Sequence, residues 1–286
     1  MEGEICNHRG GRTDITFLLD RSGSMERIWE DTMGGFNGFV EEQKKQPGEA
    51  VLTLVQFNHE VWEKYVCVPL KDVERMTFKT YTPGGMTALL DALGATIVRT
   101  GERLKAMQES DRPAKVIFVI VTDGHENSSK EYTKQKVAEM VAHQQTIYSW
   151  NFVFLGANMN AFTEAGKVGV QDGNTYNFKS TKHGIGLAFK AVTCGMSAYR
   201  AGADVRTTNY FGGDTGSAPP PPSPQQPQAV QPDVAVDLAS GPDRQAVSVI
   251  RSNSSVKEVE ITHYKTPLKD ADLGLDLEDF GGSHAD

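Results

Sequence analysis

Three separate pieces of this 286-residue chain place oxygen-bearing side chains where they can bind a metal ion. Asp20, Ser22 and Ser24 directly follow a short apolar run, Thr87 ends a loop with two glycines, and Asp123 follows another apolar run. Carboxylate and hydroxyl oxygens are ligands of hard divalent cations, and Mg²⁺ takes about six oxygens at about 2.0–2.1 Å. Two carboxylates and three hydroxyls leave a coordination position for an oxygen from outside. The sequence therefore predicts a site for Mg²⁺ or Mn²⁺ formed by Asp20, Ser22, Ser24, Thr87 and Asp123.

The segments that must position these residues are of two kinds. Short, continuously apolar runs rich in β-branched and aromatic residues are typical of parallel strands buried on both faces. Such runs occur at 15–19, 51–57, 116–121 and 152–155, with a shorter one at 175–178. Other segments have apolar residues three or four apart, as in helices that face a core. These lie within 29–40, 90–104 and 185–199.

The order of these segments predicts the fold. The apolar runs 51–57 and 61–68 are separated only by Asn58-His59-Glu60, which is long enough for a hairpin and too short for a helical crossover. We therefore expect an α/β fold: a doubly wound, mostly parallel, Rossmann-like sheet with one antiparallel edge strand and helices on both faces. Ligands of such sheets bind at the carboxyl ends of the strands, so the three oxygen-bearing pieces should meet at one rim. An extended turn would point Asp20, Ser22 and Ser24 the same way.

These residues resemble a known motif. Asp20-x-Ser22-x-Ser24, Thr87 in a Gly-Gly-x-Thr loop and Asp123 in Thr-Asp-Gly resemble the metal-ion-dependent adhesion site (MIDAS) of von Willebrand factor type A (VWA) domains. The resemblance covers roughly residues 14–201, with all five positions in chain order. It implies that Ser22, Ser24 and Thr87 touch the metal, that Asp20 and Asp123 hold it mainly through water, and that a carboxylate of a bound partner completes the shell.

The resemblance also implies a function. Extracellular members of this family serve adhesion, whereas intracellular members assemble complexes, including complexes with AAA+ ATPases. We therefore expect a protein-interaction module whose partner offers an Asp or Glu carboxylate. Arg21 and Met86 are variations within the motif loops that the resemblance does not explain, and the C-terminal quarter has no counterpart in it.

Composition divides the chain into three parts. We predict a VWA domain over 1–212, a Pro/Gln-rich linker over 213–245, and an acidic tail over 246–286 that contains a stretch, Ala246 to Tyr264, able to form a strand. The net charge is −8, and residues 213–286 carry 12 acidic and 5 basic residues, so the C-terminal quarter holds seven of the eight excess charges. The segment from Asp270 to Asp286 has six acidic residues and no Lys or Arg.

Composition and the lack of certain motifs argue against several classes of protein. A general nucleic-acid binder needs a basic surface. The sequence has no apolar run long enough to cross a membrane, no secretory signal pattern, and three cysteines without metal-type spacing. We therefore expect a cytoplasmic protein that binds neither nucleic acid nor membrane. No His-Glu-x-x-His, P-loop, Gly-x-Ser-x-Gly or complete Gly-x-Gly-x-x-Gly motif occurs, so we expect no enzyme activity.

Alternatives stay open at this point. Asp20 and the serines can be a capped turn, and an intact site can be functionally idle. The protein can also be a structural subunit whose tail is a connector, or a hydrolase that uses the same cation. His125, Glu126 and Asn127 can line the rim or belong to a polar loop, and Tyr81 and Arg21 can contact a ligand or lie on the surface.

The tail has alternatives of its own. It can be a disordered, solubilising extension, or it can dock through Leu273, Leu275, Leu277 and Phe280 while its carboxylates meet positive charge. One of its carboxylates can also fill the open metal position, in the same chain or in a neighbouring one.

Overall fold

The computed structural model of this chain describes residues 11–157, 160–202, 210–211 and 262–264. The predicted linker and acidic tail lie outside the described residues, except for 262–264. The strands are β1 (Thr13–Asp20), β2 (Ala50–Phe57), β3 (Val61–Pro69), β4 (Lys115–Thr122), β5 (Asn151–Ala157), β6 (Thr175–Phe178) and β7 (Thr262–Tyr264). The α-helices are α1 (Trp29–Lys44), α2 (Leu89–Lys105), α3 (Lys134–Tyr148), α4 (Ala161–Lys167) and α5 (Lys182–Arg200). Short 3₁₀ helices are η1 (Gly23–Arg27), η2 (Leu70–Asp72), η3 (Glu109–Asp111) and η4 (Asp172–Asn174).

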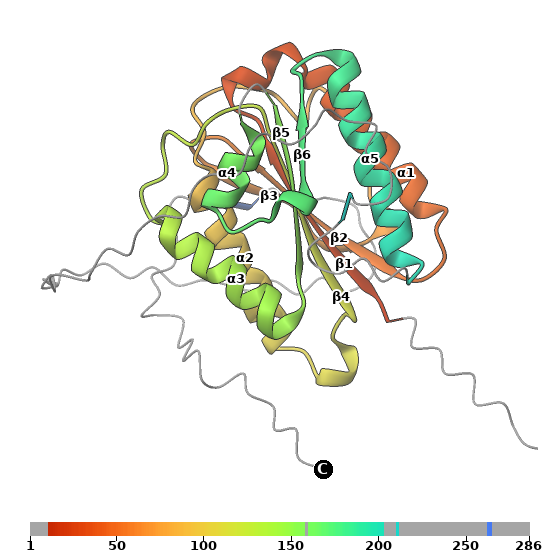
Figure 1. The fold of residues 1–286 in the computed structure, drawn as a ribbon. Coiled ribbons are helices and arrows are strands. Elements are labelled where there is room, and N and C mark those ends of the chain that lie inside the picture. The colour runs from red at the N-terminus through yellow and green to blue at the C-terminus, as the bar shows by residue number, and fades with distance from the viewer. Residues whose placement is uncertain (1–10, 158–159, 203–209, 212–261, 265–286) are drawn as a thin grey trace, which may run out of the picture. The chain divides into compact units, whose positions relative to one another are not determined.

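The strands form one sheet in the order β6-β5-β4-β1-β2-β3-β7. The pairings among β1, β2, β4, β5 and β6 are parallel, whereas β3 is antiparallel to both of its neighbours. Helices α1 and α5 cover one face, and α2, α3 and α4 cover the other (Figure 1). The predicted α/β class and the antiparallel strand beside β2 are confirmed. The three residues of β7 pair with the start of β3, on its outer side.

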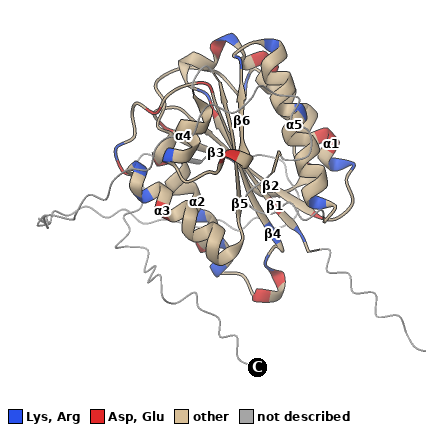
Figure 2. Ribbon diagram, viewed as in Figure 1, with Lys and Arg blue, Asp and Glu red and all other residues tan. Residues whose placement is uncertain are grey.

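The central strands are buried on both faces, as their continuous apolarity predicts. All residues of β1, β2 and β5 are buried. Side chains alternate between the faces of a strand: Phe17 packs edge-on against Phe36 and Phe39 of α1, whereas Leu18 belongs to the cluster under α2 and α3. Charged residues lie mainly on helices and loops, while the central strands are almost free of them (Figure 2). In the part of the chain that is described, no helix is long and apolar enough to span a membrane.

One buried ion pair fixes α2 against the sheet. Asp14 of β1 is fully buried, and its carboxylate lies 2.8 Å from the guanidinium of Arg103 in α2. Arg103 also contacts the sulfur of Cys67 in β3 at 3.4 Å. Burial raises the pKa of Asp14, and the charge of Arg103 partly opposes this rise. The pair therefore ties α2, which begins two residues after Thr87, to β1 and β3.

We expect replacement of Arg103 by Met to lower the free energy of unfolding by about 3–5 kcal/mol, because it removes the ion-pair partner of the buried Asp14 carboxylate and leaves only the weaker interaction with Arg12. Urea unfolding followed by circular dichroism measures this change. The matched control is Arg75→Met at an exposed arginine, which should change stability by less than about 0.5 kcal/mol. Equal losses in the two variants would contradict the role given to the pair.

Candidate metal centre

The structure brings the five predicted residues together at the carboxyl edge of the sheet. Ser24 Oγ lies 3.0 Å from Ser22 Oγ and donates a hydrogen bond to Asp123 Oδ1 at 2.6 Å. Asp20 ends β1, and its Oδ1 accepts a hydrogen bond from the Ser22 backbone N–H at 2.7 Å. The loop after β1 and the loop after β4 are thus joined through potential metal ligands.

Thr87 is the fifth predicted ligand. The surroundings of Gly124 show that oxygen atoms of the predicted ligands lie close to one another. A Cβ atom added to Gly124 would lie 3.1 Å from Ser24 Oγ, 3.2 Å from Thr87 Oγ1 and 3.9 Å from Asp20 Oδ2. The missing side chain of Gly124 therefore leaves a small space bordered by oxygen atoms from separate loops. Such a set of oxygen donors fits a hard divalent cation. Among the described residues, no cluster of three or more His, Cys, Asp and Glu forms a metal site of another type.

The two carboxylates are held in an environment that disfavours their negative charge. Burial raises the pKa of Asp20 to about 6, although hydrogen bonds from Thr122 and Ser22 lower it in part. Burial also raises the pKa of Asp123, against hydrogen bonds from Ser24 and Ser180. The charge of Asp123 adds to the rise at Asp20. A divalent cation would stabilise both ionised carboxylates, because a nearby opposite charge favours the charged form.

The backbone after β1 differs from the extended turn that we predicted for all three residues. Ser22 is extended, with φ −64° and ψ 168°, but Ser24 lies in the first turn of η1. The side-chain oxygen of Ser22 makes no capping hydrogen bond to this helix. A capped turn therefore does not account for Ser22, whose hydroxyl faces Ser24 instead.

The loop before Thr87 is fixed by its glycines and by the β2–β3 hairpin. Gly85 has φ +80°, and a Cβ atom there would lie 2.3 Å from a ring nitrogen of His59, so a larger residue would be strained and would clash. The carbonyl of Gly85 accepts a hydrogen bond from the N–H of Gly23 at 3.0 Å. Asn58 of the hairpin donates to the carbonyl of Gly84 at 2.6 Å. The loop after β1 and the loop before Thr87, which both carry predicted ligands, are therefore joined by a direct hydrogen bond.

The residues after Asp123 brace Thr87 from the other side. Asn127 Oδ1 accepts a hydrogen bond from the Thr87 N–H at 2.9 Å, and the Asn127 N–H donates to the Thr87 carbonyl at 3.0 Å. Glu126 accepts the backbone N–H of Leu90 in the first turn of α2 at 3.0 Å. His125 is exposed and lies 3.4 Å from Glu164. The polar-loop interpretation of 125–127 is therefore right for Glu126 and Asn127, which act as supports.

The sequence did not reveal every supporting residue. Thr122 donates a hydrogen bond to Asp20 Oδ2 at 2.6 Å, and Ser180 donates to Asp123 Oδ2 at 3.4 Å. Ser180 follows the end of β6 by two residues, so the strand-end argument could have found it. Tyr81 is a correction: it is fully buried, and its hydroxyl donates to the Asp20 carbonyl at 2.7 Å. It supports Asp20 from inside and does not contact a ligand.

Comparison with known proteins shows the family of this chain. The sequence model of the von Willebrand factor type A domain matches residues 14–184, which is more than half of the chain. The chain therefore belongs to the VWA domain family. VWA domains are generally protein-interaction modules, and in some of them the interaction depends on a metal ion at a MIDAS. No curated protein matches the chain.

Several solved structures are similar to this chain at low sequence identity. Proximal thread matrix protein 1 from the mussel byssus, solved with a zinc-occupied MIDAS motif, is 16% identical with a TM-score of 0.47, over 65% of this chain and 46% of that one. The vWF domain of the type V pili tip protein Mfa5 from Porphyromonas gingivalis is 9% identical with a TM-score of 0.48, over 66% of this chain and 96% of that one. Manganese-loaded TRAP protein of Plasmodium vivax is 16% identical with a TM-score of 0.44, over 60% and 70%. This chain thus spans less than half of the mussel protein.

We expect Gly124→Ala to lower the affinity for Mn²⁺ by roughly tenfold or more, which is about 1.4 kcal/mol. The added methyl group would push the Ser24 and Thr87 oxygens away from the space between them. Isothermal titration calorimetry on the full chain measures the affinity. Gly101→Ala is the matched control, because a Cβ atom there meets nothing within 4 Å. Unchanged affinity in Gly124→Ala would mean that the cation does not bind here.

The raised pKa of Asp20 predicts the pH dependence of metal binding. Below about pH 6 a proton competes with the cation for this carboxylate, so Mn²⁺ affinity should fall by up to about tenfold per pH unit. Without metal, the folded state binds this proton more tightly than the unfolded chain. The free energy of unfolding should therefore rise as the pH falls from above 6 towards 4. Titrations between pH 7.5 and 5 test both trends, and Asp20→Asn should weaken both without abolishing them, because the pKa values of Asp123 and Asp14 are raised as well. A flat profile in the wild-type chain would contradict this assignment.

Proposed function

We propose that this VWA domain is a metal-dependent protein-interaction module. Asp20, Ser22, Ser24, Thr87 and Asp123 would hold Mg²⁺ or Mn²⁺, and the cation would bind an Asp or Glu carboxylate of a partner protein. The observation that carries this proposal is the arrangement of oxygen atoms from three separate loops around the space beside Gly124. When bound, the cation would supply the positive charge that attracts the partner's carboxylate.

The hydrogen bonds favour different roles for the hydroxyls and the carboxylates. Asp20 Oδ2 already accepts from Thr122, and Asp123 Oδ2 accepts from Ser180. These bonds orient the two aspartates and suit them to holding the cation through water, while the hydroxyls of Ser22, Ser24 and Thr87 would be direct ligands. Because hydroxyls are neutral, such a cation would keep enough charge to bind one more carboxylate.

The rim of the site favours a partner that is both acidic and apolar. Ser24 is exposed, and Met86, directly before Thr87, is an apolar side chain with 56% of its surface exposed. The Arg21 guanidinium lies over the ring of Trp62 at 4.3 Å and donates to the Thr82 carbonyl. The residues next to Thr87 and Asp20 in the chain thus offer an exposed apolar side chain and a cation–π pair, which suit a partner of this kind.

Several finer expectations from the sequence remain predictions. They are a role in assembling complexes that include an AAA+ ATPase, a cytoplasmic location, the lack of enzyme activity, and the lack of nucleic-acid and membrane binding. The alternative of a structural subunit differs from the proposed function in one respect: its partner capture would depend on the tail and not on the cation.

We expect Ser22→Ala to weaken Mn²⁺ binding by about tenfold or more and to abolish capture of the same partner proteins that EDTA releases. The matched control is Ser110→Ala, an exposed serine in η3, which should leave both unchanged. Calorimetry with Mn²⁺ and quantitative affinity purification with the full chain as bait measure the two effects.

If the capture of partner proteins is unchanged by both EDTA and Ser22→Ala, the proposal is wrong and the structural subunit is favoured. Mg²⁺-dependent turnover in a hydrolase screen, lost in Ser22→Ala, would favour the hydrolase.

A further inference from the structure

Strand β7 ends at the carboxyl edge of the sheet, which carries the predicted metal centre and is called the metal edge below. Four residues lie in one row across neighbouring strands: Asp20 pairs with Phe57, Phe57 with Val61, and Val61 with Tyr264. Neighbouring strands are about 4.7–4.9 Å apart, so the Cα atoms of Tyr264 and Asp20 are roughly 15 Å apart. Because β7 is antiparallel to β3, it runs in the same direction as β1, and its last residue, Tyr264, lies level with Asp20 at the carboxyl edge that carries the metal centre.

The chain after Tyr264 is long enough to reach the cation. Asp276 follows Tyr264 by twelve residues, and a flexible segment of that length has a typical end-to-end distance of about 17–21 Å. This distance is close to the span of roughly 15 Å, and the local concentration of a tethered ligand is highest when the two match. For such short tethers it lies in the millimolar range. A tail carboxylate would therefore bind before a free partner at ordinary concentrations.

The chemistry of the tail fits the rim of the site. The segment Leu275-Asp276-Leu277-Glu278-Asp279-Phe280 offers carboxylates flanked by apolar side chains. Exposed Met86 and the Arg21–Trp62 pair provide apolar and cationic surface beside the predicted ligands. Beyond Lys269 the tail has no Lys or Arg that would repel the cation.

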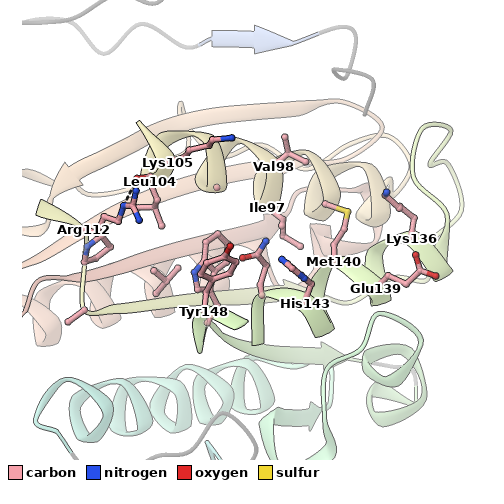
Figure 3. Close-up of a pocket in the computed structure, with 16 residues that line it drawn as sticks. Ile97, Val98, Leu104, Lys105, Arg112, Lys136, Glu139, Met140, His143 and Tyr148 are labelled. Atoms are coloured by element: carbon pink, nitrogen blue, oxygen red, sulfur yellow. Dashed lines mark hydrogen bonds between the residues drawn. The ribbon is translucent and has the colours of Figure 1, made fainter. Parts of the chain in front are cut away.

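A groove between α2 and α3 is the competing place for this segment. It has a volume of about 410 Å³, with an apolar floor that includes Ile97 and Met140 and a rim that includes Lys105, Arg112 and Lys136. Figure 3 shows these side chains lining the groove between the two helices.

One end of the groove lies far along the sheet from the end of β7. It extends to Val116, which pairs with Asp14 near the amino end of β1. That row is six residues from Asp20, or about 20 Å along the strand. The metal centre is level with the end of β7, whereas this end of the groove is not, and this difference favours the metal centre.

From these observations we propose that residues 273–280 are a tethered ligand of the same chain's metal centre. A carboxylate of this segment would coordinate the bound cation, and an outside partner would have to displace it. This inference rests on the proposed function, because it requires the cation. It adds a mode of regulation: the partner's apparent affinity would be reduced by the fraction of sites that the tail occupies.

Mn²⁺ calorimetry on three full-length chains tests the proposal. The tail variant carries Asp272→Asn, Asp276→Asn, Glu278→Gln and Asp279→Asn. The control carries Asp214→Asn, Asp233→Asn, Asp237→Asn and Asp243→Asn, which remove the same charge from the linker region. Loss of a tethered ligand should weaken Mn²⁺ binding by about tenfold in the tail variant, and the control should stay within about twofold of the wild type.

A fluorescent peptide of residues 268–286 gives a second readout. It should bind the tail variant in Mn²⁺ at least about fivefold more tightly than it binds the wild type, whose own tail competes, and EDTA should release it. Peptide binding that resists EDTA but is lost in Arg112→Gln/Lys136→Gln would place the segment in the groove and overturn the proposal. Mn²⁺ affinity that rises with protein concentration, with dimers on size exclusion, would overturn it in favour of a second copy.

The two failures can be told apart. If the wild-type chain binds no Mn²⁺, the proposed function fails and the tethered ligand fails with it. If the wild-type chain binds Mn²⁺, and the tail variant binds it as the control does, only the tethered ligand is wrong.

Discussion

The metal edge depends on keeping two carboxylates ionised in a buried place. Asp20 ends β1 and Asp123 directly follows β4, the neighbouring strand, and both are almost completely shielded from water. Burial raises the pKa of both, and the charge of Asp123 raises that of Asp20 further. Hydrogen bonds from Ser22, Thr122, Ser24 and Ser180 offset only part of this cost. A divalent cation is the natural counter-charge, and the neighbouring hydroxyls are arranged where such a cation would find its remaining ligands.

The fold supplies this arrangement through its connections. Parallel strands bring the loops after β1 and β4 to the same edge, and the β2–β3 hairpin holds the loop before Thr87 through the hydrogen bond of Asn58. The ion pair of Asp14 and Arg103 fixes α2 at the opposite end of β1. Helix α2 begins two residues after Thr87, so this pair helps to set the position of a predicted ligand from the far end of the helix. The geometry of the predicted metal centre therefore depends on how α2 packs against the sheet.

Local patterns predicted most of this arrangement because strand ends are visible in the sequence. Continuous apolar runs located β1 and β4, and Asp20 and Asp123 follow from where those runs stop. The packing of Tyr81 could not be predicted in this way, because its burial depends on a loop that folds back under Asp20. The partnership of Asp14 with Arg103 joins residues far apart in the chain and has no local signature. The 3₁₀ turn at Ser24 was missed because glycine and serine permit both an extended and a helical turn.

The central claim is that the oxygen atoms beside Gly124 hold a divalent cation. X-ray diffraction from crystals of the full chain grown with Mn²⁺, recorded at the manganese absorption edge, tests it most directly. The account predicts one strong anomalous peak between the hydroxyl oxygens of Ser22, Ser24 and Thr87, with Asp20 and Asp123 next to it. An anomalous peak elsewhere, or none at this edge with Mn²⁺ present in excess, would contradict it.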